Sequence, residues 1–225
     1  MGRWIAAEGS VFPEFTERNN VLPAFAVPAD WPMWMCIDPG YDHPCGVTWN
    51  TISPNGRTYT VDEIKLRETS IERIVELIRR RQRGCDAIYL DPHGANQRTQ
   101  VAAGVTFAQQ MATHGFRCQF WPVVQGRELE ASVEFHRQRI AAGMYKVFDT
   151  CVETIAEHQS WMYKRVRGGE VPIGDDAYED RNQDCLDGIL GWERTGPRFP
   201  PPAPAVPRWL PPRQAASTIP KQEHV

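Results

Sequence analysis

The sequence lacks any apolar run of about 20 residues, the length that an α-helix needs to cross a bilayer. Its first residues, MGRWIAAEGS, have neither the basic start nor the long apolar core of a secretory signal peptide. None of the six cysteines stands in a C-x-x-C pair, and no cysteine–histidine cluster has zinc spacing. These absences argue against a membrane-spanning chain and a structural zinc domain, and they favour reduced thiols in a cytosolic protein.

A strong charge of either sign is also missing, since the formal net charge is −3 at pH 7. This excludes a protein that binds nucleic acid through bulk positive charge, although a local basic groove stays open. The chain has 225 residues, of which 41% are hydrophobic. That size and composition suit one globular domain with a full core.

Proline is unevenly distributed along the chain. Nine of the 19 prolines follow Gly196, which predicts a polyproline-like or disordered tail over residues 196–225. Residues 1–30 mix polar side chains with three prolines, and we expect an extended lead-in there. The folded domain is therefore predicted over residues 31–195.

Within that domain the hydrophobic pattern changes from strand-like runs to helical periods. Asn55-Gly56 between the second and third runs is a hairpin signal, so the first three strands should form an antiparallel meander. The predicted strands cover residues 33–37, 45–52, 58–65, 87–90, 117–124, 144–148 and 161–166. The predicted helices cover about 69–83, 99–113, 129–140, 150–158 and 182–193, with capping boxes at Thr69/Glu72 and Thr150/Glu153. This order predicts an α/β fold with a mixed sheet and helices packed on its faces.

Two predicted strands end on an aspartate followed by proline, at Asp38 in CIDPG and at Asp91 in YLDPH. Asp-Pro is an ordinary way to end a strand and begin a turn. However, ligands commonly bind at the carboxyl ends of strands in open α/β sheets. Two unpaired carboxylates at neighbouring strand ends would also repel each other, so that one takes a proton or a divalent cation neutralises both.

The last predicted helix contains a third acidic group, in NQDCLDGILGWE. Asp184 and Asp187 are three residues apart and share one face, which Gly188 and Gly191 extend. Each glycine costs the helix roughly 1 kcal/mol relative to alanine, so we expect this face to approach the sheet closely. Asp184 also suits the helix dipole, and its role stays open between helix stabiliser and ligand.

Aspartates at two strand ends and on one helix form an oxygen-rich set without a thiol or imidazole at matching spacing. Such a set favours Mg²⁺ or Mn²⁺ over zinc. Two such ions about 3.5–4 Å apart can activate a water and stabilise the leaving oxygen of a phosphodiester.

The order of these aspartates resembles the ribonuclease H-like nuclease superfamily. The detail is similar to one branch, the nuclease domain of tailed-bacteriophage terminase large subunits. The similar stretches are AAEGSVFPEF (6–15), IDPGYDHPCGVTW (37–49), IYLDP (88–92) and DCLDGILGWE (184–193). Two positions depart from the pattern, since Asp184 stands where many relatives carry histidine and Gly191-Trp192 replaces Arg-Tyr.

The resemblance implies a ribonuclease H-like fold in which Asp38, Asp91 and Asp187 are the catalytic metal-binding carboxylates and Asp184 is auxiliary. It implies two Mg²⁺ or Mn²⁺ ions as cofactors and endonucleolytic cutting of double-stranded phage DNA during packaging in the host cytoplasm. The implied partners are this DNA, the portal protein, the small terminase subunit and the ATPase part of the large subunit. Since the chain has no G-x-x-x-x-G-K-[ST] motif, we expect that it does not hydrolyse ATP. We therefore expect the chain to be either an excised nuclease domain or the product of a naturally split large subunit.

An acidic site needs cations around it to receive a phosphate backbone. Candidates are Arg80 and Arg81, with Arg79 and Arg83, at the end of the first helix, and Lys164, Arg165 and Arg167 beside the Gly168-Gly169 turn. The helix-end arginines equally suit a solvated helix end that complements the dipole. His93 follows Asp91-Pro92 and could approach the site, and His43 is placed similarly after Asp38, although a loop histidine is more often incidental.

Two other functions stay open. One is another ribonuclease H-like enzyme, such as a junction resolvase or a transposase-like strand-transfer enzyme. The other is a non-catalytic docking module of the packaging machine, whose proline-rich tail engages another protein.

Overall fold

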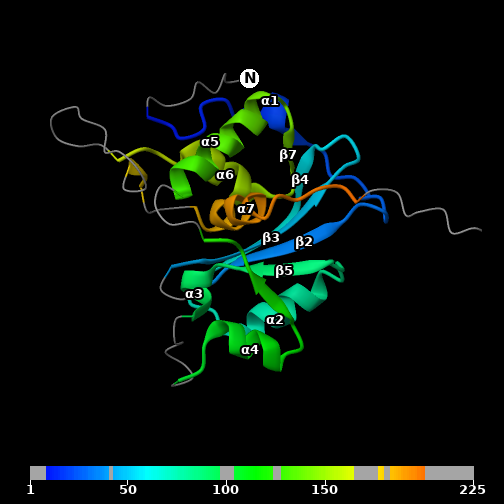
Figure 1. The fold of residues 1–225 in the computed structure, drawn as a ribbon, viewed down its shortest axis with the longest axis vertical. Coiled ribbons are helices and arrows are strands. Elements are labelled where there is room, and N and C mark those ends of the chain that lie inside the picture. The colour runs from blue at the N-terminus through cyan, green and yellow to red at the C-terminus, as the bar shows by residue number, and fades with distance from the viewer. Residues whose placement is uncertain are drawn as a thin grey trace, which may run out of the picture.

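A seven-stranded sheet forms the centre of the computed structural model, which describes residues 9–40, 43–96, 104–123, 128–164, 177–179 and 183–200. Helices cover both faces of this sheet (Figure 1). The strands are β1 (Val21–Leu22), β2 (Met33–Asp38), β3 (Cys45–Ile52), β4 (Thr58–Leu66), β5 (Ala87–Leu90), β6 (Cys118–Phe120) and β7 (Tyr145–Phe148). The helices are α1 (Glu17–Asn20), α2 (Ile71–Arg80), α3 (Pro92–Asn96), α4 (Phe107–Thr113), α5 (Glu128–Ala141), α6 (Val152–Ser160) and α7 (Asp184–Arg194).

The strand order is β1-β7-β4-β3-β2-β5-β6. β2, β3 and β4 pair antiparallel, as the Asn55-Gly56 turn between β3 and β4 predicts, and Gly56 has a φ of 79°. β5 joins β2 in parallel and β6 joins β5, while β7 and β1 extend the other side. The predicted meander and the predicted mixed α/β sheet are therefore confirmed.

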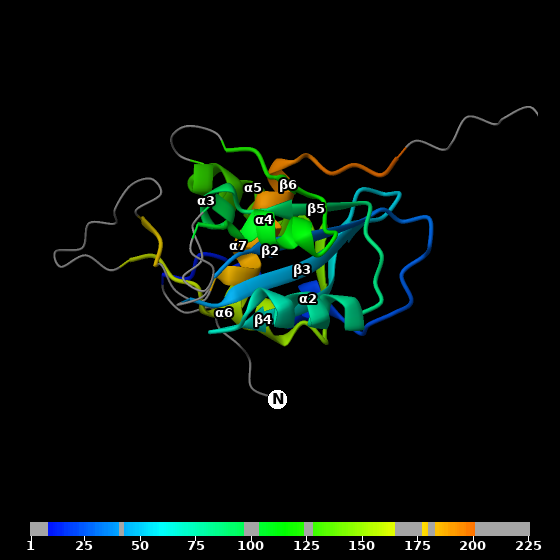
Figure 2. The same ribbon diagram turned by 90° about the horizontal axis from the view of Figure 1, so that it is seen from below.

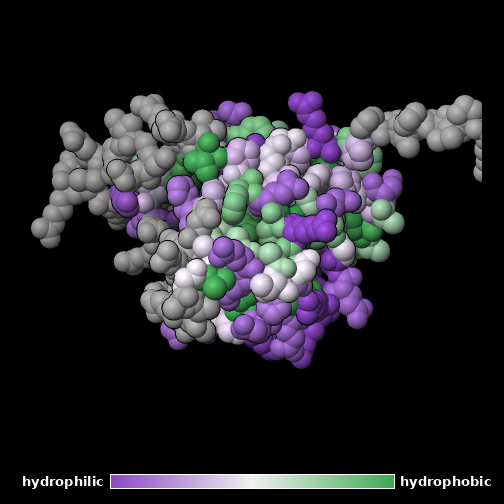
Figure 3. Space-filling view, turned by 60° about the horizontal axis from the view of Figure 1, so that its bottom comes forward, coloured by the Kyte–Doolittle hydropathy of each residue, from purple (hydrophilic) through white to green (hydrophobic). Residues whose placement is uncertain are grey.

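Different helices cover the two faces of the sheet. Helices α5, α6 and α7 lie on one face of the sheet and α2, α3 and α4 on the other, and the view from below agrees (Figures 1 and 2). α2 shows why such helices pack, because Ile71, Ile74, Val75 and Ile78 are all buried at helical spacing. In the space-filling view, apolar side chains gather in the middle of the face and hydrophilic ones along its lower edge (Figure 3). Among the described residues, no helix combines the length and the apolar character that crossing a membrane requires.

Both predicted capping boxes were wrong in detail. α2 begins after Ser70, whose hydroxyl accepts the N–H of Arg73, whereas the Thr69 hydroxyl donates to the Arg67 carbonyl. The sequence offers two adjacent hydroxyl residues there, and the second one is the N-cap.

α6 begins after Cys151 without any cap from its own side chains. The carboxylate of Glu63 on β4 replaces Thr150 in this role: it accepts the N–H groups of Glu153 and Thr154 at 2.7 and 2.8 Å. A partner this far away in sequence leaves no local pattern.

Two further predicted elements are shorter than expected. Within residues 104–113, the described part of the predicted helix 99–113, only α4 is helical, and Thr106 and Gln109 start it with a capping box. Within residues 117–123, the described part of the predicted strand 117–124, the strand is Cys118–Phe120. Of the predicted strand 161–166, Met162 and Tyr163 form isolated bridges to Ser10 and Tyr178.

Part of the predicted lead-in packs into the domain. Val11 and Phe12 are at most 1% exposed and belong to the main core, together with Phe15. Val21 pairs in parallel with Val147, so this segment also adds an edge strand.

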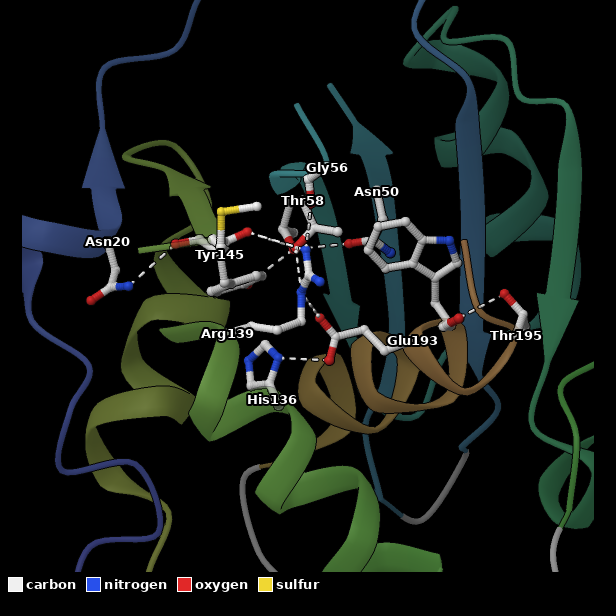
Figure 4. Close-up of polar contacts among 12 residues, drawn as sticks. Asn20, Asn50, Gly56, Thr58, His136, Arg139, Tyr145, Glu193 and Thr195 are labelled. Carbon is white, nitrogen blue, oxygen red and sulfur yellow. Dashed lines mark hydrogen bonds and ion pairs between the residues drawn. The ribbon is translucent and has the colours of Figure 1, made fainter. Parts of the chain in front are cut away.

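A buried polar network holds the carboxyl end of α7. Glu193 lies 2.9 Å from the ring of His136 and 3.4 Å from the Arg139 guanidinium, both on α5 (Figure 4). Arg139 also donates to the carbonyl of Gly56 at 2.8 Å and so reaches the β3–β4 turn. The end of α7 is thus fixed to a neighbouring helix and to the sheet.

Candidate active site

Asp38 and Asp91 stand at the ends of two adjacent parallel strands. Ile37 is paired with Leu90, and the N–H of Asp91 donates to the Ile37 carbonyl at 3.0 Å. Both aspartates therefore lie at the same edge of the sheet, as their Asp-Pro motifs suggested. The Asp38 residue is only 8% exposed.

Asp91 also performs the ordinary turn function of an Asp-Pro pair. Its carboxylate accepts the N–H of Gly94 at 2.7 Å and that of His93 at 3.3 Å, which caps α3. These two hydrogen bonds fix the orientation of the Asp91 side chain. The His93 side chain itself is exposed.

α7 brings the remaining aspartates to this edge by packing very closely on β2 and β3. A Cβ added to Gly188 would lie 3.3 Å from the Thr48 hydroxyl and 3.6 Å from the Cys36 Cβ. A Cβ added to Gly191 would overlap the Trp121 ring. The close approach that the two glycines predicted is confirmed, and it places Asp187 next to the strand ends.

The electrostatics of the site are dominated by crowded carboxylates. Burial raises the pKa of Asp38 well above its usual range, and the charges of Asp187, Asp91 and Asp184 add to this effect. Burial, followed by Glu157 and Asp184, raises the pKa of Asp187 to about 8. Within the described part of the chain, the carboxylates of Asp38 and Asp187 accept no hydrogen bond and form no ion pair.

Among the described residues, the group of potential metal ligands that lie close together differs from the predicted one. Atoms of Asp38, His43 and Asp184 all lie within 4.8 Å of one another. His43, which received no role from the sequence, has its Nδ1 atom 3.6 Å from the Asp184 carboxylate. Asp91 and Asp187 act on Asp38 through their charges without belonging to this group.

Sequence reasoning also missed a buried ion-pair cluster beside Asp184. The ammonium of Lys65, at the end of β4, lies 2.6 Å from Glu157 Oε1 and 3.0 Å from Asp184 Oδ2. Glu157 on α6 is 1% exposed, and its carboxylate accepts the N–H groups of Cys185 and Leu186 at the start of α7. Burial opposes the charged lysine, but these two carboxylates raise the pKa of Lys65 above its usual value.

The only sequence signal for this cluster was that Glu63 and Lys65 stand two residues apart in β4 and therefore share one face. Polar residues on the helix-covered face of a strand require buried partners. The sequence of the strand did not predict which residues those partners are.

The predicted DNA-contacting arginines of α2 are engaged within the protein. Arg80 is paired with Glu76, and Arg81 donates to the Glu63 carbonyl at 3.0 Å and lies 3.6 Å from Asp62. Arg80 and Arg81 come before the first residue of β5 in the chain, whereas Asp91 comes directly after its last residue. Lys164 is exposed, while Arg165, Arg167 and the Gly168-Gly169 turn lie outside the described residues. The DNA contacts stay predictions.

Comparisons with known sequences found no matching family model and no matching curated protein. Solved structures do match. The large terminase of a thermophilic bacteriophage has a TM-score of 0.65 at 19% identity, covering 86% of this chain and 47% of that one. The P22 large terminase nuclease domain has a TM-score of 0.65 at 20% identity, covering 84% of this chain and 92% of that one. The chain has the fold of large-terminase nuclease domains.

A third structure with this terminase-nuclease fold is the large terminase nuclease domain of bacteriophage SPP1 with bound Mn. Its TM-score is 0.56 at 16% identity, covering 78% of this chain and 96% of that domain. The chain thus spans about half the length of the thermophilic phage's large terminase but nearly the whole of the isolated nuclease domains. The predicted ribonuclease H-like fold and the predicted resemblance are confirmed at the level of the fold.

Proposed function

We propose that this chain is a metal-dependent endonuclease that hydrolyses phosphodiester bonds of double-stranded phage DNA during genome packaging. Its catalytic centre would consist of Asp38, Asp91 and Asp187, with Asp184 as an auxiliary ligand. Two divalent cations, Mg²⁺ or Mn²⁺, would be its cofactors. The reaction belongs to the host cytoplasm, where phage particles assemble.

The observation that carries this proposal is the carboxylate of Asp38. It is almost completely buried, has no hydrogen-bond donor among the described residues, and faces the charges of three other aspartates. A buried carboxylate crowded by other carboxylates is costly, and a divalent cation is the counter-charge that an oxygen-rich environment selects.

The other ligand positions fit the same kind of ion. Carboxylate oxygens suit Mg²⁺ and Mn²⁺, while the imidazole of His43 would favour Mn²⁺ over Mg²⁺. When bound, such ions supply an activated water and stabilise the charge on the leaving oxygen. The residues of this chain then hold the phosphodiester and the ions in place, and the cap on α3 keeps Asp91 in one orientation.

The fold supports double-stranded DNA as substrate, by analogy with the terminase nuclease domains that it matches. Lys164, Arg165, Arg167, Arg80 and Arg81 are the proposed contacts to the phosphate backbone, which would be independent of sequence and sensitive to salt. The portal protein, the small terminase subunit and an ATPase part of the large subunit are the proposed assembly partners. We expect no ATP hydrolysis from this chain.

The test is plasmid nicking by the purified chain in Mn²⁺, compared with Asp38→Asn and Asp187→Asn. We expect both variants to lose at least roughly 100-fold in rate, because metal ligands act as one unit. The matched control is Asp30→Asn, which removes an exposed carboxylate just before β2, at the end of the strand opposite Asp38. It should nick at the wild-type rate.

Equal nicking by wild type and Asp38→Asn would contradict the metal-site assignment. Preference for a four-way junction over linear duplex would favour a resolvase. Absence of both cutting and Mn²⁺ binding by the wild-type chain would favour the docking module.

A further inference from the structure

We propose that Lys65 is a positioning residue of the cation site, whose ammonium holds Asp184 so that one carboxylate oxygen faces Asp38 and His43. This inference rests on the proposed function, because it assigns a task to a residue beside the proposed ions.

The geometry separates the two oxygens of Asp184. Oδ2 lies 3.0 Å from the Lys65 ammonium, whereas Oδ1 is the atom that lies 3.6 Å from His43. The oxygen that we propose as a ligand and the lysine-bound oxygen therefore belong to the same carboxylate. Fixing one of them fixes the other, which is how partners beyond the ligands tune a metal site.

Lys65 is itself held rigidly. Its side chain is 12% exposed, and Glu157 lies 2.6 Å away from the same ammonium. Glu157 in turn accepts two N–H groups from the first turn of α7, the turn that begins at Asp184. The lysine thus connects β4, α6 and α7 at the point where Asp184 enters the site.

A simpler role for Lys65 would be to neutralise Glu157, which is buried and would otherwise be an uncompensated charge. Positioning of Asp184 and neutralisation of Glu157 predict different results for a variant that removes the lysine and the glutamate charge together. If Lys65 only neutralises Glu157, this variant should bind Mn²⁺ normally, whereas loss of positioning should weaken Mn²⁺ binding. Lys65→Met with Glu157→Gln removes one positive and one negative charge, so the net charge beside Asp184 is unchanged. The amide oxygen introduced by Glu157→Gln can still accept one of the two N–H groups at the start of α7, which Cys185 and Leu186 donate to different oxygens of Glu157.

The experiment measures Mn²⁺ binding by calorimetry and unfolding temperature in EDTA for the wild-type chain and for K65M/E157Q. The control is R137M/E14Q, which removes an ion pair of 2.7 Å that joins α5 to the segment before α1. We expect K65M/E157Q to weaken Mn²⁺ binding roughly 10- to 100-fold, the range typical for partners of metal ligands. R137M/E14Q should bind Mn²⁺ with the wild-type affinity, because its pair does not contact the aspartates.

Wild-type Mn²⁺ affinity in a folded K65M/E157Q chain would overturn the positioning role and leave the proposed function standing. Absence of Mn²⁺ binding by the wild-type chain would overturn both. If K65M/E157Q fails to fold, Lys65→Arg decides instead, since it retains a cation with different reach and donor geometry. A change in Mn²⁺ affinity of Lys65→Arg supports positioning, and an unchanged affinity contradicts it.

Discussion

Gly46 on β3 and Asp184 at the start of α7 are in direct backbone contact. A Cβ added to Gly46 would overlap the carbonyl carbon and oxygen of Asp184, and it would lie 2.9 Å from the N atom of Cys185. The first turn of α7 therefore lies on the sheet at a distance that only glycine permits. Both carboxylates that α7 contributes to the site depend on this contact.

We expect Gly46→Ala to displace the start of α7 and to destabilise the protein by about 2–4 kcal/mol, since the overlapping atoms are backbone atoms that cannot rotate away. Mn²⁺ affinity should fall with it, because Asp184 and Asp187 move. Chemical denaturation and calorimetry measure the two effects. Gly84→Ala is the matched control, because no heavy atom lies within 4 Å of its added Cβ. A stable Gly46→Ala variant with normal Mn²⁺ binding would show that the contact is unimportant.

Asp187→Asn should stabilise the metal-free chain while removing stabilisation by metal. Burial, followed by the charges of Glu157, Asp184 and Asp91, raises the pKa of Asp187 to about 8, so this side chain takes up a proton on folding near neutral pH, a cost that asparagine avoids. A gain of about 1 kcal/mol would raise the unfolding temperature by roughly 2–4 °C in EDTA. In Mn²⁺ at about 100 times its Kd, the wild type should gain about 2.7 kcal/mol and the variant much less. Lower stability of Asp187→Asn in EDTA would argue that this carboxylate is not under repulsion.

Glu63→Gln tests the capping of α6 by a carboxylate from β4. Glu63 accepts the N–H and the hydroxyl of Thr154 and the N–H of Glu153, and glutamine would retain only part of this set. We expect a loss of about 1–2 kcal/mol in the free energy of unfolding, as for other lost caps. Glu76→Gln is the control: its pairs with Arg73 and Arg80 are exposed, so the loss should stay below about 0.5 kcal/mol. Equal losses in the two variants would contradict the capping role.

His158 should make folding stability sensitive to acid. Burial and the neighbouring ring of His136 lower the pKa of His158 well below its usual range, and its Nδ1 atom lies 2.7 Å from the Thr154 carbonyl. Because the folded pKa is below the unfolded value of about 6.5, the unfolded chain binds the extra proton first. The contribution of neutral His158 to the free energy of unfolding is therefore fully present above about pH 6.5. It is lost as the pH falls below this value, by up to about 1.4 kcal/mol per pH unit.

The measurement is the difference in unfolding free energy between the wild type and His158→Gln from about pH 5 to about pH 8, a range that brackets the unfolded pKa. Taking the difference cancels the titration of the site carboxylates. Tyr145 and His136 also face the ring, and both remain in the variant. The exposed His93→Gln variant is the control and should show no such slope. A difference that is constant across this pH range would contradict the prediction.

The sequence by itself determined the parts of this protein that depend on neighbouring residues. Strand-like runs and the Asn55-Gly56 turn specified the meander, and the Asp-Pro pairs specified two strand ends that meet at one edge. The spacing of Asp184 and Asp187, extended by Gly188 and Gly191, specified a helix face that packs closely on the sheet. These signals are local, because strand and helix periods and turn chemistry act over a few residues.

Only the tertiary structure decided which groups surround the aspartates. Lys65 reaches Glu157 across 92 residues of chain, and Glu63 caps α6 across 90. His43 meets Asp184 although 141 positions separate them, the difference between residue numbers 184 and 43. A buried charge takes whichever partner the packing of strands and helices brings within about 3 Å, and that choice leaves no periodic trace in the sequence.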